Sequence, residues 1–396
     1  MAYALTKKAL LLDLYAAFAC AKKHKASKAY VLHFRKNLDK NLRQLCDDLW
    51  TRRYKPEPSS CFIVERPKKR EVFAAQFRDR VVHHLYYNYT HILFERTFIQ
   101  DTYSCIPGRG THYGVERMEM HIRRESRNYT RKCYALKLDK RGYFMHIDRH
   151  RLLDITVSTL RKMGLHRVGD SPQTWNDNLD MGFIEWLSQE IIMLNPKTHC
   201  HIVGSVKDWE GLDHNKSLFY TPDGCGLPIG NLTSQLLSNV YLNLFDQYMK
   251  RVLKCRHYGR YVDDSFVISC DKSWLLSLVP KIRSFLKRML GLDLHMGKLH
   301  IIDVSLGVEF LGAFVRKFRT YVSRASIGRS VVGILELDLN DKAQVWRSIN
   351  SFIGMMAHYT SYYIRCRVFL RAEFLTIATF DDGVKRMNKP LVFNNF

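Results

Sequence analysis

The feature that most constrains the fold is a pair of adjacent carboxylates, Asp263 and Asp264, between two short apolar segments. Residues 260–262 precede the pair and residues 265–269 follow it, so the pattern predicts two strands joined by a tight turn. Adjacent acids at such a turn repel each other and gain nothing from packing, whereas divalent cations would neutralise both. The pattern therefore predicts a metal site, with an ordinary Asp-containing hairpin turn as the alternative.

The charge of the chain predicts a polyanionic partner. Lys and Arg total 62 against 38 Asp and Glu, which gives a formal net charge of +24 over 396 residues. These cations are spread along the sequence rather than held in a tail. We expect nucleic acid as the partner and no membrane, because no polybasic amphipathic helix or transmembrane stretch is found in the sequence.

The ten cysteines are scattered without a CxxC pair, which is typical of reduced, cytoplasmic proteins rather than of disulfide frameworks or zinc ribbons. His199, Cys200 and His201 are expected in a loop without metal ligation, because adjacent residues of an extended segment point to opposite faces. Asp13 interrupts the apolar stretch 9–21, which favours an amphipathic helix over a signal peptide. We therefore expect a cytoplasmic location.

The order of predicted elements favours an α+β fold. Starting with the strand that ends on Asp139, the pattern reads strand, helix, two strands, helix and strand, which is the ferredoxin-like order with helices packed on one face of a sheet. The expected elements are helices over residues 1–50, strands near 61–64 and 71–75, a helix through Phe94, a strand at 133–138, helices within 150–195, an irregular stretch at 196–223, a sharp turn at 224–230, a helix over 232–253, the carboxylate hairpin, a helix over 273–290, a strand pair around Phe310 and helices beyond 325 with Asn340 as a cap.

Three acids have the chemistry and the expected placement for phosphoryl transfer. Transfer to a growing chain uses two divalent ions about 3.5–4 Å apart, held by carboxylates from more than one strand. Asp139 ends one predicted strand, and Asp263 with Asp264 lies at the tip of the hairpin. Neighbouring strands of a small sheet would bring all three together, so the sequence predicts them as metal ligands.

A series of short motifs, in this order, resembles the fingers and palm of a reverse transcriptase. The resemblance covers about residues 60 to 325, and the joint pattern is far more specific than any single piece. The motifs are the basic hairpin from Arg66 to Arg78, RDRVVHHLYYNY at 78–89, YSCIPGRGTH at 103–112, LDKRGYF at 138–144, GLPIGNLTSQ at 226–235, YVDD at 261–264, GLDLHMGK at 291–298 and GVEFLG at 307–312.

The resemblance implies an RNA-directed DNA polymerase in which Asp139, Asp263 and Asp264 bind two Mg²⁺ ions, with Mn²⁺ able to substitute. Phe144 would be the bulky gate whose ring excludes a ribose 2′-hydroxyl, and ordinary core packing is the alternative for this residue. Lys298 would protonate the leaving pyrophosphate, against the alternative of a surface lysine. An RNA-dependent RNA polymerase is disfavoured, because Phe144 would obstruct ribonucleotides.

The resemblance also implies binding of deoxynucleoside triphosphates. Lys69, Arg70 and Arg78 would meet the triphosphate, where charge-assisted hydrogen bonds are strong. The other residues implied at the nucleotide site are Tyr143, Ile229, Gly230 and Gln235. The implied architecture is a right-hand polymerase fold with an N-terminal helical extension at 1–58, fingers at 59–135, a ferredoxin-like palm at 136–318 with an insertion at about 150–223, and an α-helical thumb at 319–396.

Within the family, IGNLTSQ at 229–235 resembles the reverse transcriptases of diversity-generating retroelements of bacteria and phages. Most bacterial relatives carry Gln-Gly at the turn, where this chain has Ile229 and Gly230. A glutamine can form hydrogen bonds beside the nascent base pair, whereas isoleucine can only pack. The resemblance implies error-prone copying of a template-repeat RNA at adenines, and partners comprising template RNA, a cDNA–primer duplex and a small basic oligomeric accessory variability protein.

Two other interpretations remain open from the sequence. The chain could be a different bacterial reverse transcriptase, of the free-standing intron-derived or phage-defence type, without adenine-specific errors. It could also be a catalytically silent nucleic-acid-binding protein, although the presence of all three acids and of Phe144 argues against silence.

Overall fold

The structure is a computed structural model that describes residues 5–65, 68–375 and 378–388. It begins with three helices, as the spacing of apolar residues predicts. These are α1 (Lys7–Ala21), α2 (Ala29–Lys36) and α3 (Leu38–Trp50). In α1 the side chain of Thr6 caps the first turn, and Leu10, Leu14, Ala17 and Phe18 lie buried on one face. That face packs against α4 (Phe77–Glu95), so the N-terminal helices and α4 share one core.

A small sheet lies beside these helices. Strands β1 (Ser59–Val64) and β2 (Arg70–Ala74) form the predicted antiparallel hairpin, with Cys61 opposite Phe73. The predicted basic turn includes Arg66 and Pro67, which lie outside the described residues. A third strand, β4 (Cys200–Ile202), pairs in parallel with β1. The expectation of an irregular stretch at 196–223 was therefore wrong at β4. A strand of three residues is too short to show a periodic pattern, and its partner β1 lies far away in the sequence.

The second sheet has the order β5-β6-β3-β7, and all its strands are antiparallel. Its strands are β3 (Tyr134–Leu138), β5 (Tyr258–Tyr261), β6 (Asp264–Ser269) and β7 (His300–Asp303). With helices α6 (Arg149–Gly164), α7 (Met181–Ile192), α8 (Leu232–Gln247) and α9 (Lys272–Leu290), the chain order is that of a ferredoxin-like unit. The last strand of this unit is β7, which the sequence did not predict. The predicted strand pair around Phe310 belongs to another sheet.

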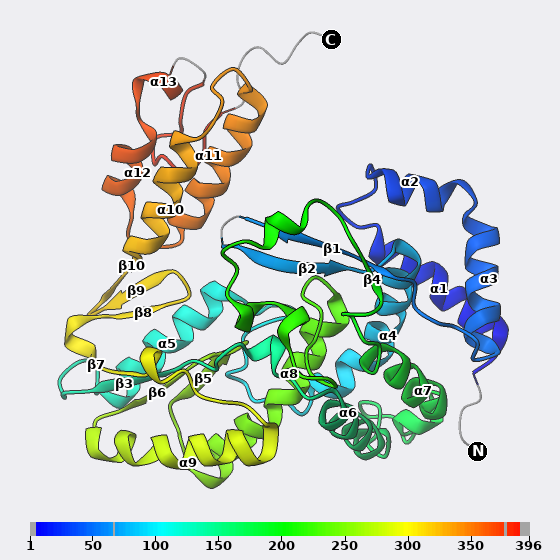
Figure 1. The fold of residues 1–396 in the computed structure, drawn as a ribbon. Helices are drawn as coiled ribbons and strands as arrows, with labels where there is room; N and C mark the ends of the chain where they lie inside the picture. The colour runs from blue at the N-terminus through cyan, green and yellow to red at the C-terminus, as the bar shows by residue number, and fades with distance from the viewer. Residues whose placement is uncertain (1–4, 66–67, 376–377, 389–396) are drawn as a thin grey trace.

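The second sheet is covered on both faces rather than on one. Because successive residues of a strand point to opposite faces, Leu136 and Val267 join the core with α8 and α9, while Ala135 and Phe266 pack on the other side. That other side is closed by α5 (Thr111–Glu125), which precedes β3 in the chain. Figure 1 shows the sheet between α5 and α9.

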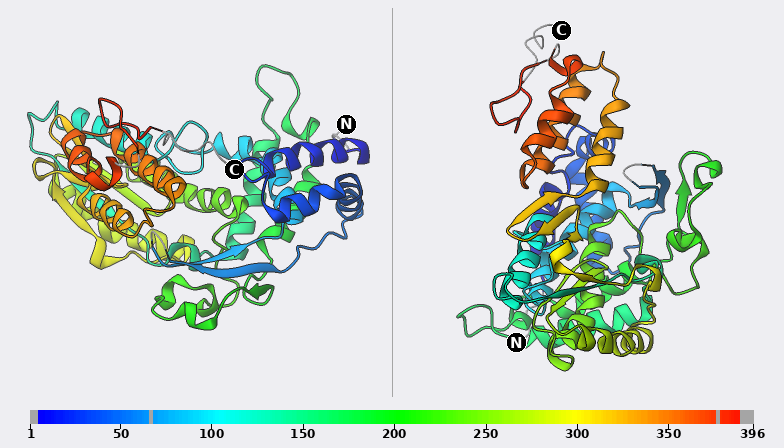
Figure 2. Two further views of the ribbon diagram at one scale, coloured as in Figure 1. Left: turned by 90° about the horizontal axis from the view of Figure 1, so that it is seen from above. Right: turned by 90° about the vertical axis from the view of Figure 1, so that its left-hand side faces the viewer.

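The C-terminal helices form a separate lobe joined to the second sheet through a third one. That sheet consists of β8 (Val308–Phe310), β9 (Ala313–Arg316) and β10 (Arg319–Val322). Helices α10 (Arg324–Leu335), α11 (Lys342–Ala357), α12 (Tyr362–Phe369) and α13 (Ala372–Leu375) follow and have their own apolar core. The side view in Figure 2 shows this lobe rising above the second sheet. Asp341, not the predicted Asn340, caps α11.

The helix expected over 232–253 is α8, which continues at Tyr248–Val252 as a π-helical turn. Within the described residues, no helix is both long enough and apolar enough to cross a membrane.

Candidate active site

The carboxylate pair lies at the end of the β5–β6 hairpin, as the pattern predicts. Tyr261 pairs with Asp264, so Val262 and Asp263 form a two-residue turn. On the other side of β6, Leu138 pairs with Ser265. Asp139 directly follows Leu138 and therefore lies opposite Asp264 at the same end of the sheet. The fold thus brings together three acids from two neighbouring strands.

The electrostatics of the three acids show that they interact. Burial, and next the carboxylates of Asp264 and Asp139, raise the pKa of Asp263 to about 6. The pKa of Asp264 is also raised, first by desolvation and then by Asp139, although its side chain lies partly in solvent. Both shifts disfavour the ionised carboxylates, first through desolvation and then through repulsion by the neighbouring acids.

Two lysines lie beside these acids. Lys298 Nζ is 2.5 Å from Asp139 Oδ2, and this hydrogen bond raises the pKa of the lysine. Lys140 is fully buried, and its Nζ donates to the backbone oxygen of Asp263 and to Ser265 Oγ, both at 2.8 Å. Burial lowers the pKa of Lys140 to about 8. One lysine therefore contacts a carboxylate, and the other holds the backbone of the turn.

The chemistry of the three acids fits a hard divalent cation, because carboxylate oxygens are the preferred ligands and the excess negative charge would be relieved. Across the residues that the structure describes, no three His, Cys, Asp or Glu side chains are already grouped around a metal position. Asp139 is instead held by Lys298. Coordination would therefore need the side chains to rotate toward one another and Lys298 to release Asp139.

Tyr143 and Phe144 lie in a 3₁₀ turn shortly after β3. The hydroxyl of Tyr143 donates to the backbone oxygen of Ser238 at 2.6 Å, and the residue is buried against α8. Phe144 is only partly buried, and its backbone oxygen accepts from the N–H of Leu227 at 2.9 Å. The structure thus places Tyr143 in the core and leaves part of Phe144 accessible.

The turn at 226–230 lies between this segment and β2. The backbone oxygen of Ile229 accepts from the N–H of Phe73 at 2.8 Å, and its side chain packs on the cluster that contains Phe73. Gly230 has φ +121°, and a Cβ there would lie 2.9 Å from Val72 Cγ1, so only glycine fits. Gln235 follows on α8, with its Oε1 3.7 Å from Cys105 Sγ, beside an open pocket of about 250 Å³.

The predicted triphosphate-binding cations divide into two groups. Arg70 is exposed at the start of β2, and the neighbouring Lys69 bonds to the backbone oxygen of Glu210. Arg78 contacts other residues, and none of its described hydrogen bonds or ion pairs is shared with Lys69 or Arg70. Its guanidinium bonds to Asp48 at 2.9 Å and stacks on Tyr54, so it ties α4 to the N-terminal helices.

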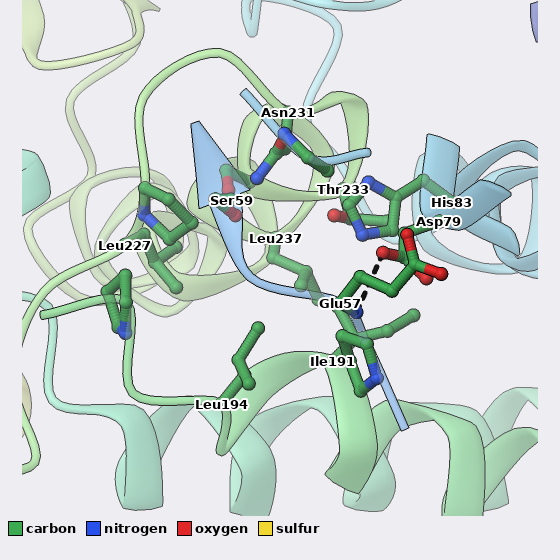
Figure 3. A pocket seen from close by; sticks show the side chains of 15 residues that line it. Glu57, Ser59, Asp79, His83, Ile191, Leu194, Leu227, Asn231, Thr233 and Leu237 are labelled. Carbon is green, nitrogen blue, oxygen red and sulfur yellow. Dashed lines mark hydrogen bonds between the residues drawn. The ribbon is translucent and has the colours of Figure 1, made fainter. Parts of the chain in front are cut away.

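A small cavity of about 30 Å³ lies where β1, α4, α7 and the start of α8 meet. Figure 3 shows His83 beside Thr233 in this cavity, with Asp79 hydrogen-bonded to the backbone N–H of Glu57 at 2.9 Å. His83 is buried, and its Nδ1 has no partner among the residues described. Burial lowers the pKa of His83 to about 4.

Sequence reasoning missed one strongly charged group near the site. Arg260 is fully buried beneath the carboxylate hairpin and pairs with the equally buried Asp246 at 2.6 Å. The available signal was an arginine in an otherwise apolar strand, together with an acid beside Phe245 on the apolar side of a helix. Fully buried Arg and Asp side chains are usually found paired, as these two are.

Comparison with known proteins places these features in a family. A model of the family described as "Reverse transcriptase (RNA-dependent DNA polymerase)" matches residues 66–315. No curated protein matches the chain. Among solved structures, telomerase from Candida albicans in complex with a fragment of telomeric RNA is 12% identical with a TM-score of 0.47, covering 76% of this chain and 53% of that one. Apo telomerase from Candida tropicalis is 12% identical with a TM-score of 0.46, covering 76% and 52%.

This chain thus spans about half the length of those telomerase chains. The family match, in contrast, extends over well more than half of this chain, from residue 66 to Val315 in β9. It includes the two strands that carry the three acids. The chain therefore belongs to the reverse transcriptase family.

Proposed function

We propose that the chain extends DNA primers on RNA templates by two-metal nucleotidyl transfer at Asp139, Asp263 and Asp264. The single observation that carries this proposal is the β3–β6 register, which sets Asp139 opposite Asp264. Two Mg²⁺ ions bound to these acids, or Mn²⁺ in their place, would activate the primer 3′-hydroxyl and neutralise the pyrophosphate. The protein's part is to hold three carboxylates at one end of a rigid sheet.

The surrounding side chains have roles that follow from their positions. Lys298 is an ammonium bonded to Asp139, so it lies where it would give a proton to the leaving pyrophosphate. Lys69 and Arg70, at the start of β2, would contact the triphosphate. Arg78 contributes indirectly, by fixing α4 against the N-terminal helices. Phe144 would exclude the ribose 2′-hydroxyl.

Primer extension on an RNA template in Mg²⁺ tests the proposed chemistry. Asp263→Asn should lower the extension rate at least about 100-fold, since it removes one of the ligands that neutralise the metals. The matched control is Asp271→Asn, which removes a carboxylate that caps α9 on the same segment of chain. Equal extension by wild type and Asp263→Asn would refute the metal-binding role.

The sugar gate is tested by the ratio of kcat/KM for deoxynucleotides to that for ribonucleotides. Phe144→Ala should lower this ratio about 10-fold or more, because the ring no longer opposes a 2′-hydroxyl. Tyr143→Phe is the control, since it removes only a hydroxyl that bonds within the palm. An unchanged ratio in Phe144→Ala would assign the ring to core packing.

We further propose that the enzyme is of the diversity-generating type, which copies a template-repeat RNA with errors at adenines. The contacts of the 226–230 turn support this. Its backbone is fixed to β2 through Phe73, yet the Ile229 side chain that takes the place of glutamine has no hydrogen-bonding group. Template RNA and a small basic accessory variability protein are the partners that this proposal requires.

Sequencing of cDNA made by wild type and Ile229→Gln tests this proposal. The variant should make several-fold fewer errors opposite template adenine, with errors at the other bases changed less. A wild-type error spectrum without adenine bias would instead favour a free-standing intron-derived or phage-defence enzyme. Equal adenine error rates in the two proteins would remove Ile229 as the cause.

A further inference from the structure

A buried polar cluster lies beneath the carboxylate hairpin, and the proposed chemistry does not use it. Its centre is Arg260, which is 0% exposed on β5. Two of its nitrogens, Nε and Nη2, donate to the carboxylate of Asp246 at 2.8 and 2.6 Å. The hydroxyl of Tyr258 donates to the same carboxylate at 2.6 Å. These bonds neutralise the buried charge and fix the guanidinium in one orientation.

The remaining donor of Arg260 reaches the turn itself. Its Nη1 donates to the backbone oxygen of Val262 at 2.9 Å and to Asn239 Oδ1 at 3.1 Å. The N–H of Val262 donates to Ser104 Oγ at 3.1 Å, and Ser104 is in turn hydrogen-bonded to Asn239. Both polar backbone groups of Val262 are therefore held by side chains from outside the turn.

Val262 requires such support because its backbone is strained. Its φ is +52°, in the left-handed region, where a β-branched residue costs about 1–3 kcal/mol. A conformation of this kind persists only where the surroundings fix it. If Val262 relaxed, the peptide plane that joins it to Asp263 would rotate, and the turn that carries Asp263 and Asp264 would shift relative to Asp139.

We propose that Arg260 and Ser104 are positioning residues, which hold Val262 in its left-handed conformation and thereby aim the carboxylates of Asp263 and Asp264 at the metal site. This inference rests on the proposed function, in which these acids bind divalent cations. It also gives a role to the YSCIPGRGTH motif, since Ser104 belongs to it and the adjoining Thr102 forms a β-bridge with Arg260.

The affinity of the full-length protein for Mn²⁺ alone, measured by electron paramagnetic resonance without nucleotide or nucleic acid, tests the inference. Ser104→Ala should weaken Mn²⁺ binding about three- to ten-fold, the effect of one lost hydrogen bond. The matched control is Ser188→Ala, which removes another fully buried hydroxyl, bonded to Tyr86 on a distant helix. It should lower the Tm comparably and leave the Mn²⁺ affinity unchanged.

A second variant separates strain from general loosening of the fold. Glycine adopts left-handed φ without penalty, so adding Val262→Gly to Ser104→Ala should recover most of the lost Mn²⁺ affinity. Wild-type affinity in Ser104→Ala, or a double variant no better than Ser104→Ala, would overturn the inference. The proposed function is tested separately with Asp263→Asn. If this variant binds Mn²⁺ as tightly as the wild type, the proposed function is overturned.

Discussion

At the scale of single residues, the acids of the site cost stability in the absence of metal. Burial and the neighbouring carboxylates raise the pKa of Asp263 to about 6 in the folded chain, against about 3.9 when unfolded. The folded state therefore binds the proton more tightly, so the ionised carboxylate destabilises the protein above pH 6. This penalty disappears as the pH falls from about 6 to about 4.

We therefore expect Asp263→Asn to stabilise the metal-free protein by about 2 kcal/mol at pH 8 and by almost nothing at pH 4. Thermal unfolding in EDTA at both pH values measures this difference. Asp303→Asn is the control of opposite sign, because hydrogen bonds from Ser305 lower the pKa of Asp303 and its removal should destabilise at pH 8. A destabilised Asp263→Asn protein at pH 8 would contradict the expectation.

His83 has the opposite dependence on pH. Its pKa is about 4 when folded because burial disfavours the charged form, whereas an unfolded histidine titrates near 6.5. Lowering the pH from 6.5 to 4 therefore protonates the unfolded state alone and removes up to about 3 kcal/mol of stability. His83→Gln should lack this loss in urea denaturation at pH 7.5 and 4.5, and parallel losses in both proteins would show that His83 is not the cause.

Residue chemistry explains what the sequence could and could not predict about the site. The convergence of Asp139, Asp263 and Asp264 was predictable, because acids at strand ends are poor structural choices and stand out. From the sequence, Arg78 was an equally plausible anion-binding cation. Its contacts with Asp48 and Tyr54 show that it joins α4 to the N-terminal helices. The residue type alone does not separate an anion-binding arginine from a structural one, whereas its contacts in the folded chain do.

At the scale of elements, periodic segments were predictable and short nonlocal strands were not. Helices α4, α8 and α9 follow apolar patterns that extend over several turns. Strands β4 and β7 have three and four residues, with histidines on exposed positions, and their partners lie far away in sequence. Their pairing comes from tertiary structure, which local patterns do not encode.

The 226–230 turn makes a prediction at the same scale. Gly230→Ala places a methyl group against Val72 and the backbone of Phe73, so the turn should move away from β2. We expect the KM for deoxynucleotides to rise about 10-fold, because a shift of about 1 Å in a positioning element has effects of this size or larger. The control is Gly211→Ala, which also has positive φ but open space around it. Equal KM values in the two variants would contradict the role of the turn.

At the scale of the whole molecule, the net charge of +24 should dominate binding of the primer–template. Each cation that neutralises a phosphate releases a counterion, so affinity falls steeply with salt. We expect the Kd for an RNA template–DNA primer to rise at least about 10³-fold between 50 and 200 mM salt, as for proteins with six or more phosphate contacts. Fluorescence anisotropy measures it, and a change below about 10-fold would contradict a binding surface built on charge.

The proposed catalysis depends on three carboxylates that share bound metal. Anomalous diffraction from crystals of the full-length protein grown with Mn²⁺, primer–template and an incoming deoxynucleotide tests this most directly. We predict metal peaks within about 2.0–2.3 Å of oxygens from Asp139 and from the Asp263–Asp264 pair. Metal peaks only elsewhere, with Asp139 still bound to Lys298, would contradict it.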